Sequence, residues 1–133
     1  MAILGIGVDL VHIPRIAAIL ARGKSERFAC RILSKDEYLQ WQSSGFPSQT
    51  QRAQFLAVRW SVKEAAFKAM YPVVRPSWKE VTYYGISNGG QKPYITYQPG
   101  VPVNAERIGK MHVSVSHDGD YVYSSVIVEE PVE

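Results

Sequence analysis

The central stretch of the chain, from Thr50 to Met70, contains neither glycine nor proline. Five alanines lie within it, and alanine is the best helix former among the amino acids. The larger apolar residues that recur near helical spacing are Phe55, Leu56, Trp60 and Phe67. Pro72 and Pro76 follow, and proline cannot continue a helix interior. The sequence therefore predicts one long helix, against which the rest of a small domain has to pack.

A strand is predicted before this helix, from Ala2 to Val11, because its residues alternate loosely between two faces. One face carries Ile6, Val8 and Leu10, and the other carries Gly5, Gly7 and Asp9. In a half-buried strand the apolar face packs on the core. We therefore expect the branched apolar side chains to be buried and Asp9 to lie opposite them.

Three short helices are predicted between this strand and the long helix. Pro14 suits the first turn of the first helix, where its missing N–H leaves no bond unmade. Ser25 is expected to cap the second helix. Ser34, followed three residues later by Glu37, has the form of a capping box that opens the third. Residues 43–50, rich in serine, predict a loop.

The sequence after the prolines breaks into short segments typical of strands. These predicted strands are Val81 to Ile86, Pro93 to Tyr97, His112 to Ser116 and Tyr121 to Val128. The turn signals between them are Asn88-Gly89-Gly90, Pro99-Gly100 and Asp118-Gly119-Asp120. A strand, then helices, then an antiparallel meander predict an α+β domain. The chain has 133 residues, too few for a second core, so residues 1–133 form a single domain.

Composition narrows the class of protein further. Hydrophobic residues make up 46% of the chain and charged residues 20%, which is ordinary for a globular protein. The longest apolar stretches have only a few residues, against the roughly 20 that cross a bilayer, so no membrane partner is expected. The single cysteine, Cys30, can form no intramolecular disulfide, which fits a reducing compartment. We expect a soluble intracellular protein that is stabilised by packing or by assembly.

The net charge of +3 conceals an uneven distribution along the chain. Residues 1–34 carry five basic and two acidic side chains, whereas residues 112–133 carry five acidic and no basic ones. The stretch from Arg59 to Lys79 adds five basic residues against Glu64 alone. Such a basic surface favours a phosphate-bearing or acidic partner. A solvated helix face without a partner is the alternative.

Two segments carry acidic residues that suit chemistry. Asp9 ends the segment Gly5-Ile6-Gly7-Val8-Asp9, which lacks the third glycine of a nucleotide-binding fingerprint. Taken alone, Asp9 is interpreted as a solvated strand residue. Glu64 and Lys68 lie four residues apart on one helix face, a spacing that is also typical of plain surface pairs. Neither segment establishes a function by itself.

A third segment, His112 to Asp118, places His117 where a strand enters a tight turn, and turn residues on a rigid sheet often contact ligands. A Ser/His/Asp triad is not indicated, because residues two apart on one strand cannot arrange themselves as nucleophile, base and orienting group. A zinc site is not indicated either, because the three histidines lack a close metal-binding spacing.

Taken together, the ordered segments resemble those of a known family. They are Gly5-Ile6-Gly7-Val8-Asp9-Leu10-Val11, Arg59-Trp60-Ser61-Val62-Lys63-Glu64-Ala65 and Ser114-Val115-Ser116-His117-Asp118. Supporting matches are Ile13-Pro14-Arg15-Ile16, Arg27-Phe28-Ala29 and Lys92-Pro93. In this order and at these separations the chain resembles the holo-acyl-carrier-protein synthases, which are small single-domain 4′-phosphopantetheinyl transferases.

The resemblance implies an enzyme that transfers 4′-phosphopantetheine from coenzyme A to a serine hydroxyl of an apo acyl carrier protein and releases adenosine 3′,5′-bisphosphate. It also implies a requirement for Mg²⁺, with Asp9 and Glu64 as the metal ligands. A hard cation of this kind is commonly held by one or two carboxylates together with substrate phosphates. Glu64 is the expected route for the serine proton, and His117 is the second choice.

The resemblance further implies which residues bind the substrates. Those expected to contact the phosphates of coenzyme A are Arg59, Lys63, Lys68 and His117, and Lys92 and Pro93 are expected near its adenosine. The carrier protein is expected to dock on Arg15, Ile19, Arg22 and Phe28, with Arg27 and Arg31 extending that surface. The family also implies a homotrimer with active sites between subunits.

The chain departs from the common family pattern at Val8, where threonine is usual, at His12, where an acidic residue is usual, and at Gln91, where glycine often stands. None of these removes an expected metal ligand, and His12 receives no role. Two other functions stay open. One is a non-enzymatic module whose basic surface and tryptophans bind nucleic acid, although the favoured interpretation has no nucleic-acid partner. The other is a transferase domain of a larger fatty acid synthase. The expected compartment is the cytoplasm, with the mitochondrial matrix as the alternative.

Overall fold

A computed structural model of the chain describes residues 1–85 and 89–132. Its elements are β1 (Ile3–His12), α1 (Ile13–Ala21), α2 (Ser25–Ile32), α3 (Lys35–Ser43), α4 (Gln49–Met70), the 3-10 turn η1 (Trp78–Glu80), β2 (Val81–Tyr84), β3 (Tyr94–Tyr97), η2 (Pro102–Arg107), β4 (Met111–Asp118) and β5 (Tyr121–Glu129). The expected order of strand, helices and strands is confirmed. The predicted continuation of a strand to Ile86 and the asparagine of the turn at 88–90 lie outside the described residues.

The strands form two antiparallel sheets rather than one meander. One sheet has the order β1-β5-β4, and the other pairs β2 with β3. The predicted pairings of β2 with β3 and of β4 with β5 are present. The pairing of β3 with β4 that a meander predicts is wrong, because η2 lies between these two strands, which are not hydrogen-bonded neighbours. Strand β1 therefore pairs with the last strand of the chain, so that Asp9 lies opposite Ser124.

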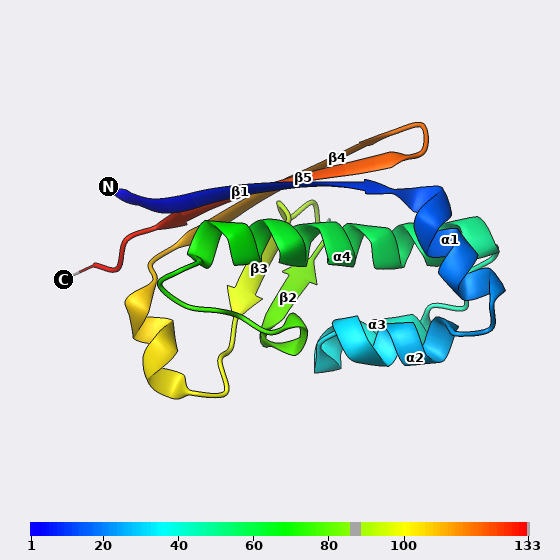
Figure 1. The fold of residues 1–133 in the computed structure, drawn as a ribbon, viewed down its shortest axis with the longest axis horizontal. Helices are drawn as coiled ribbons and strands as arrows, with labels where there is room; N and C mark the ends of the chain where they lie inside the picture. Colours follow the sequence, from blue (N-terminus) through cyan, green and yellow to red (C-terminus); the bar gives the residue numbers. More distant parts are fainter. Residues whose placement is uncertain (86–88, 133) are drawn as a thin grey trace.

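The long helix α4 lies between the two sheets (Figure 1). Its buried residues include five alanines, two in the N-terminal half and three in the C-terminal half, and small side chains let neighbouring backbones approach closely. The C-terminal half packs with the strands of both sheets, and the N-terminal half packs with α1, α2 and α3. The predicted helix from Thr50 to Met70 is confirmed with one extra residue at its start.

The expected burial of β1 is wrong. Ile6, Val8 and Leu10 are 62%, 42% and 60% exposed, whereas Gly7 and Val11 on the other face are buried. A Cβ atom on Gly5 or Gly7 would overlap the carbonyl oxygen of a residue of α4. Because only glycine permits this close approach, the small residues face the helix and the branched ones face outward. Asp9 consequently lies on the helix side of the strand.

The helix starts follow the sequence in part. The capping box is confirmed, with the Ser34 N–H donating to Glu37 Oε1 at 2.9 Å and the Glu37 N–H donating to Ser34 Oγ at 3.5 Å. Ser25 is the first residue of α2 rather than its cap, and Lys24 at the cap position makes no side-chain capping bond. Among the described residues, no helix has the length and apolar character needed to cross a bilayer.

Candidate active site

Asp9 on β1 and Glu64 on α4 lie near one another, where the strand packs on the helix. Burial raises the pKa of each carboxyl, and the charge of Asp9 raises the pKa of Glu64 further. Lys68, one turn after Glu64, partly offsets both increases, with its Nζ 3.4 Å from Asp9 Oδ1. The same ammonium donates to the carbonyl of Val8 at 2.9 Å. The fold thus brings together three of the predicted site residues.

The hydrogen-bonding capacity of the second carboxylate oxygen of Asp9 is not satisfied within the described residues. Oδ2 is buried, and it has no hydrogen-bond partner among the described residues. A buried acceptor without a partner costs free energy unless something else satisfies it. Residues 1–85 and 89–132 hold no group of three or more acidic, histidine or cysteine residues placed so that they could hold a metal ion. Asp9 and Glu64 could therefore supply two carboxylates to a cation, and its other ligands would have to come from elsewhere. Such a set suits a hard cation that keeps waters and binds substrate phosphates.

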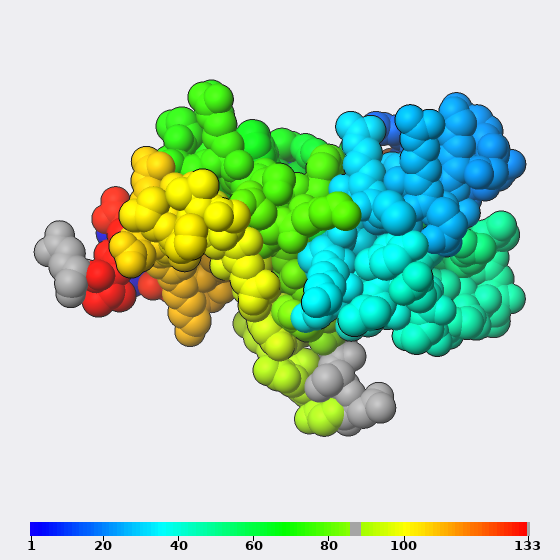
Figure 2. All heavy atoms as spheres, turned by 90° about the horizontal axis from the view of Figure 1, so that it is seen from below, coloured from blue at the N-terminus to red at the C-terminus, as the bar shows by residue number. Residues whose placement is uncertain are grey.

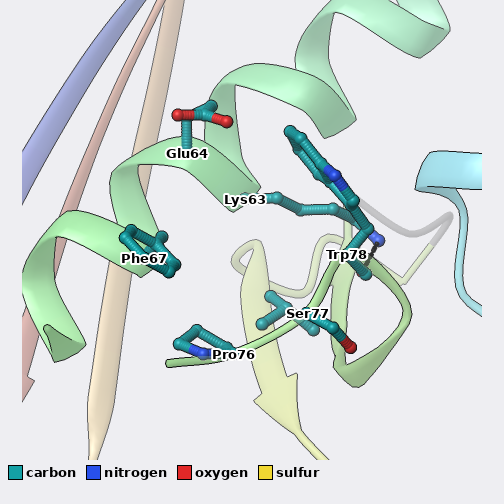
Figure 3. Close-up of a pocket in the computed structure, with 7 residues that line it drawn as sticks. Lys63, Glu64, Phe67, Pro76, Ser77 and Trp78 are labelled. Carbon is teal, nitrogen blue, oxygen red and sulfur yellow. Dashed lines mark hydrogen bonds between the residues drawn. The ribbon is translucent and has the colours of Figure 1, made fainter. Parts of the chain in front are cut away.

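A cavity of about 240 Å³ opens beside Glu64. It is lined by Lys63, Glu64, Phe67, Pro76, Ser77, Trp78 and Val81. Figure 3 shows Glu64 at the upper rim on α4, with Phe67 to one side, Trp78 to the other and Pro76 and Ser77 across from the helix. The site therefore combines a charged rim with largely apolar walls.

Lys63 does not have the place expected of a phosphate ligand. Its side chain is buried, and its ammonium is 2.6 Å from Glu37 Oε1 and donates at 2.7 Å to the carbonyls of Ile32 and Trp78. Three acceptors use its three N–H groups, so the ammonium has no donor left for a phosphate. The predicted contact of Lys63 with coenzyme A phosphates does not fit this placement. The ion pair joins α4 to α3, and the bond to the Trp78 carbonyl joins α4 to η1.

Arg59 lies on the same side of α4 as Lys63. Its guanidinium carbon is 3.7 Å from the centre of the Phe55 ring and 5.2 Å from that of Tyr83. Burial lowers the pKa of Arg59, and the nearby Glu37 partly restores it. The guanidinium thus packs on aromatic rings beside the buried ion pair, whereas Lys68 lies beside Asp9.

The other predicted ligand residues lie on different parts of the fold. His117 is exposed near the end of β4, where it lines a cavity with Leu10, Tyr121 and Tyr123 among others. Lys92 and Pro93 directly precede β3, in the second sheet. The three residues come from strands or loops that belong neither to β1 nor to α4.

The predicted docking residues gather at the α1 and α2 end of the molecule, which Figure 2 shows in blue and cyan. Ile19, Lys24, Arg27, Phe28 and Arg31 line a groove of about 290 Å³. Its two large apolar side chains are half-buried, and its basic side chains are exposed. Arg15 is exposed nearer to the carboxylates, since its charge lowers the pKa of Asp9. The groove is thus apolar within and positively charged around its rim.

Two residues that support the site, Ser61 and Glu37, are not predicted as such from the sequence. Ser61 Oγ donates to the backbone carbonyl of Asp9 at 3.2 Å and so fixes the strand against α4. The sequence predicts Glu37 only as a capping residue, yet its side chain is fully buried and also accepts from the Tyr83 N–H at 2.8 Å. The position of Ser61 two turns before Lys68 on one helix face was the only available signal for the first. No local sequence pattern indicates that Glu37 is buried or that it bonds to Tyr83.

Comparisons with known proteins agree with this geometry. Residues 5–124 match the family model of the 4′-phosphopantetheinyl transferase superfamily. The chain belongs to this superfamily. Within it, the chain is 37% identical over 131 residues to a holo-[acyl-carrier-protein] synthase of Sodalis glossinidius, covering 97% of this chain and 99% of the relative.

Solved structures share the fold. The holo-ACP-synthase of Plasmodium yoelii superposes with a TM-score of 0.80 over 98% of this chain and 97% of that one, at 20% identity. The ACPS–CoA complex of Chronobacterium ammoniagenes gives a TM-score of 0.72 at 30% identity, over 99% of this chain and 100% of that one. The α+β fold expected from the sequence is confirmed, and so is the resemblance to the holo-acyl-carrier-protein synthases.

Proposed function

We propose that this chain transfers 4′-phosphopantetheine from coenzyme A to a serine hydroxyl of an apo acyl carrier protein, leaving adenosine 3′,5′-bisphosphate. The observation that carries the proposal is the pair Asp9 and Glu64, with Lys68 beside them, on the fold of this superfamily. Two carboxylates next to one ammonium suit a reaction at a pyrophosphate, in which a cation and a basic side chain share the phosphate charge.

Asp9 and Glu64 would hold Mg²⁺, and the unpartnered Oδ2 of Asp9 supports this assignment. When bound, the ion would neutralise phosphate charge and polarise the bond that breaks. Lys68 would contact the same phosphates, since half of its side chain is exposed at the site. Glu64 would accept the proton of the attacking serine, and the burial that raises its pKa makes it a stronger base than an exposed glutamate.

The groove between α1 and α2 would receive the acyl carrier protein. Its basic rim of Lys24, Arg27 and Arg31 suits an acidic partner, and Ile19 and Phe28 within it provide apolar contact. Arg22 follows α1 at the same end of the molecule and is exposed. Arg15, whose charge reaches Asp9, would act between the docking surface and the reacting groups.

We further propose that the active protein is a homotrimer. The face of the β1-β5-β4 sheet that points away from α4 carries the exposed side chains of Ile6, Val8, Leu10, Tyr121 and Tyr123. A contiguous apolar face of this kind is unusual on a monomer. Assembly would cover this face and would allow His117, together with Lys92 and Pro93, to act on a site shared with a neighbouring copy.

Nucleic-acid binding is less well supported than transfer. Trp41 is buried, and its ring packs against Phe46 and Phe55. Trp60 stacks on Phe28 and lies 4.7 Å from the ring of Trp78. Rings engaged in this way offer few open faces for bases to stack on.

The cytoplasm is the compartment we propose. Cys30 is exposed and unpaired, which suits a reducing environment.

Titration calorimetry with coenzyme A, with and without Mg²⁺, tests the proposed function against nucleic-acid binding. We expect coenzyme A to bind in the presence of Mg²⁺ and more weakly after chelation. A single-stranded oligonucleotide should give no saturable heat at the same protein concentration. Binding of the oligonucleotide without binding of coenzyme A would contradict the proposal.

A further inference from the structure

We infer that Ser124 on β5 is a positioning residue, whose hydroxyl holds the carboxylate of Asp9 in place for the cation. The inference rests on the proposed function, because it assumes that Asp9 binds Mg²⁺. It also goes beyond that function, since none of the residues predicted for the active site lies on β5.

Ser124 lies directly across from Asp9. The two residues are paired in the antiparallel register of β1 and β5, which run side by side along α4 (Figure 1). Directly paired side chains point to the same face of a sheet, with Cβ atoms roughly 4.5–5.5 Å apart. Because Asp9 lies on the helix side of β1, the hydroxyl of Ser124 lies on the helix side of β5.

Both residues carry a buried oxygen that lacks a partner. Ser124 is 0% exposed, and neither its Oγ nor Asp9 Oδ2 makes a hydrogen bond to any of the described residues. Such atoms are rare in folded proteins, because each unmade bond costs free energy. Two of them on paired residues of neighbouring strands indicate that one further group serves both.

The chemistry of the two oxygens is complementary. An ionised carboxylate only accepts hydrogen bonds, whereas a hydroxyl both donates and accepts. Since the two atoms are not bonded to each other directly, we assign the contact to one bridging water, which accepts from Ser124 Oγ and donates to Asp9 Oδ2. Lys68 Nζ is 3.4 Å from the other carboxylate oxygen, Oδ1. The carboxylate is then held at both of its oxygens.

The neighbours of Ser124 show that packing does not require a hydroxyl at this position. The other residues of β5 on the helix side are Val122, Val126 and Val128, and each is 0% exposed. A small apolar side chain in place of Ser124 would pack among them without burying an unsatisfied oxygen. The serine therefore indicates a polar task, and the paired carboxylate of Asp9 is the polar group across from it.

Calorimetric titration of Mg²⁺ into an equimolar mixture of the protein and coenzyme A tests this task, with coenzyme A alone as the blank. Removing a group that orients a metal ligand commonly weakens metal binding by about 10–100-fold. In the variant Ser124→Ala we expect Mg²⁺ to bind about tenfold more weakly. The melting temperature of the metal-free protein should not fall, because the variant removes an oxygen that bonds to none of the described residues.

Steady-state kinetics provide a second readout that a purely structural role would not change in this way. We expect the Mg²⁺ concentration at half-maximal rate to rise about tenfold in Ser124→Ala. At saturating Mg²⁺ the variant should approach the kcat of the unaltered protein, because its metal ligands are intact.

Two matched variants separate the hydroxyl from its surroundings. Ser125→Ala removes a hydroxyl from the opposite face of the same strand and should leave Mg²⁺ binding unchanged. Ser124→Cys keeps a side chain of similar shape, but a thiol is only a weak donor. It should therefore weaken Mg²⁺ binding as Ser124→Ala does.

Three outcomes would overturn the inference. If Ser124→Ala bound Mg²⁺ as tightly as the unaltered protein, Ser124 would have no part in holding Asp9, and the proposed function would stand. Normal binding in Ser124→Cys would mean that the side chain acts by filling space. If the unaltered protein bound neither Mg²⁺ nor coenzyme A, the proposed function itself would fail, and the role of Ser124 with it.

Discussion

Asp9 and Glu64 lie close together at a cost, because two partly buried carboxylates repel each other when both are charged. Burial and this repulsion raise their pKa values, and Lys68 offsets only part of the effect. Groups held in an unfavourable environment are often functional, since packing alone would not select them. We therefore expect the carboxylates to matter more for binding a cation than for holding the fold together.

The variants Asp9→Asn and Glu64→Gln test this separation. We expect each to lower the rate of transfer by at least about 100-fold, because a bound cation contributes several kcal/mol to the transition state. The melting temperature of the metal-free protein should stay the same or rise, because the repulsion is relieved. Steady-state kinetics and thermal melts with and without Mg²⁺ measure both effects.

Glu106→Gln serves as the control for the carboxylate variants, because Glu106 is an exposed acid on η2. It should change neither quantity. A folded Asp9→Asn variant with near-normal Mg²⁺-dependent turnover would remove Asp9 from the metal site.

At the scale of elements, α4 connects the site to the fold. One side of the helix carries Glu64 and Lys68 beside β1, and another carries Arg59 and Lys63 beside the buried Glu37. The two lysines, five residues apart, therefore have different tasks. Lys63 holds α4, α3 and η1 together, and Lys68 remains available at the site.

Replacing each lysine with methionine should separate these tasks. Lys63→Met leaves Glu37 buried without its cation, and breaking a buried ion pair costs about 3–5 kcal/mol of unfolding free energy. Lys68→Met, at a half-exposed position, should change stability by less than about 1 kcal/mol but should weaken binding of coenzyme A. Urea unfolding and calorimetry provide the two measurements. Equal stability of the two variants would contradict the structural role of Lys63.

The sequence predicted α4 well and β1 only in part. An alanine-rich stretch without glycine or proline has few alternatives to a helix. Alternation in β1 identified two faces, but it could not say which one meets the helix. That choice depends on the close approach of Gly5 and Gly7 to α4 and on what covers the opposite face.

The site residues, like the strands and helices, could be predicted from the sequence only in part. The proximity of Asp9, Glu64 and Lys68 was predicted only through the family resemblance, because the strand and the helix that carry them are far apart in the sequence. The role of Lys63 could not be predicted, because its partner Glu37 comes from another helix, and burial of that pair is a property of the whole core. Spacing along one helix predicts which side chains share a face, but it does not identify what lies opposite that face.

At the scale of the whole molecule, α1 links the basic groove to the carboxylates, because it carries Ile19 of the groove and also Arg15, whose charge lowers the pKa of Asp9. The double variant Arg27→Glu with Arg31→Glu should raise the KM for the carrier protein severalfold at low salt, because it replaces attraction with repulsion. The effect should shrink at higher salt, since the Debye length is about 10 Å at 0.1 M. The KM for coenzyme A should not change.

The charge reversal of Arg107, the last residue of η2, and of Lys110, which precedes β4, is the matched control for the groove, because both are exposed basic residues. It changes the net charge equally but lies away from α1 and α2 (Figure 1). If both double variants raised the KM for the carrier protein equally, net charge rather than the groove would steer docking.

The exposed sheet face favours assembly, and the family resemblance implies that the assembly is a homotrimer. Light scattering should give a mass three times the 14.9 kDa of the chain. Leu10→Glu, which places a charge in the middle of this face, should yield monomers with reduced transfer activity. Leu39→Glu, at a similarly exposed leucine on α3, should remain trimeric. A fully active monomer of the unaltered chain would contradict a site shared between copies.

The mass of an apo acyl carrier protein after incubation with this chain, coenzyme A and Mg²⁺ tests the central claim most directly. We predict that the carrier gains the mass of one 4′-phosphopantetheine group and that adenosine 3′,5′-bisphosphate appears in equal amount. A carrier with alanine in place of its acceptor serine should gain nothing, and neither should any carrier after chelation of the metal. An unchanged mass with several apo carrier proteins, using a protein shown to bind coenzyme A, would contradict the assignment of this chain as a phosphopantetheinyl transferase.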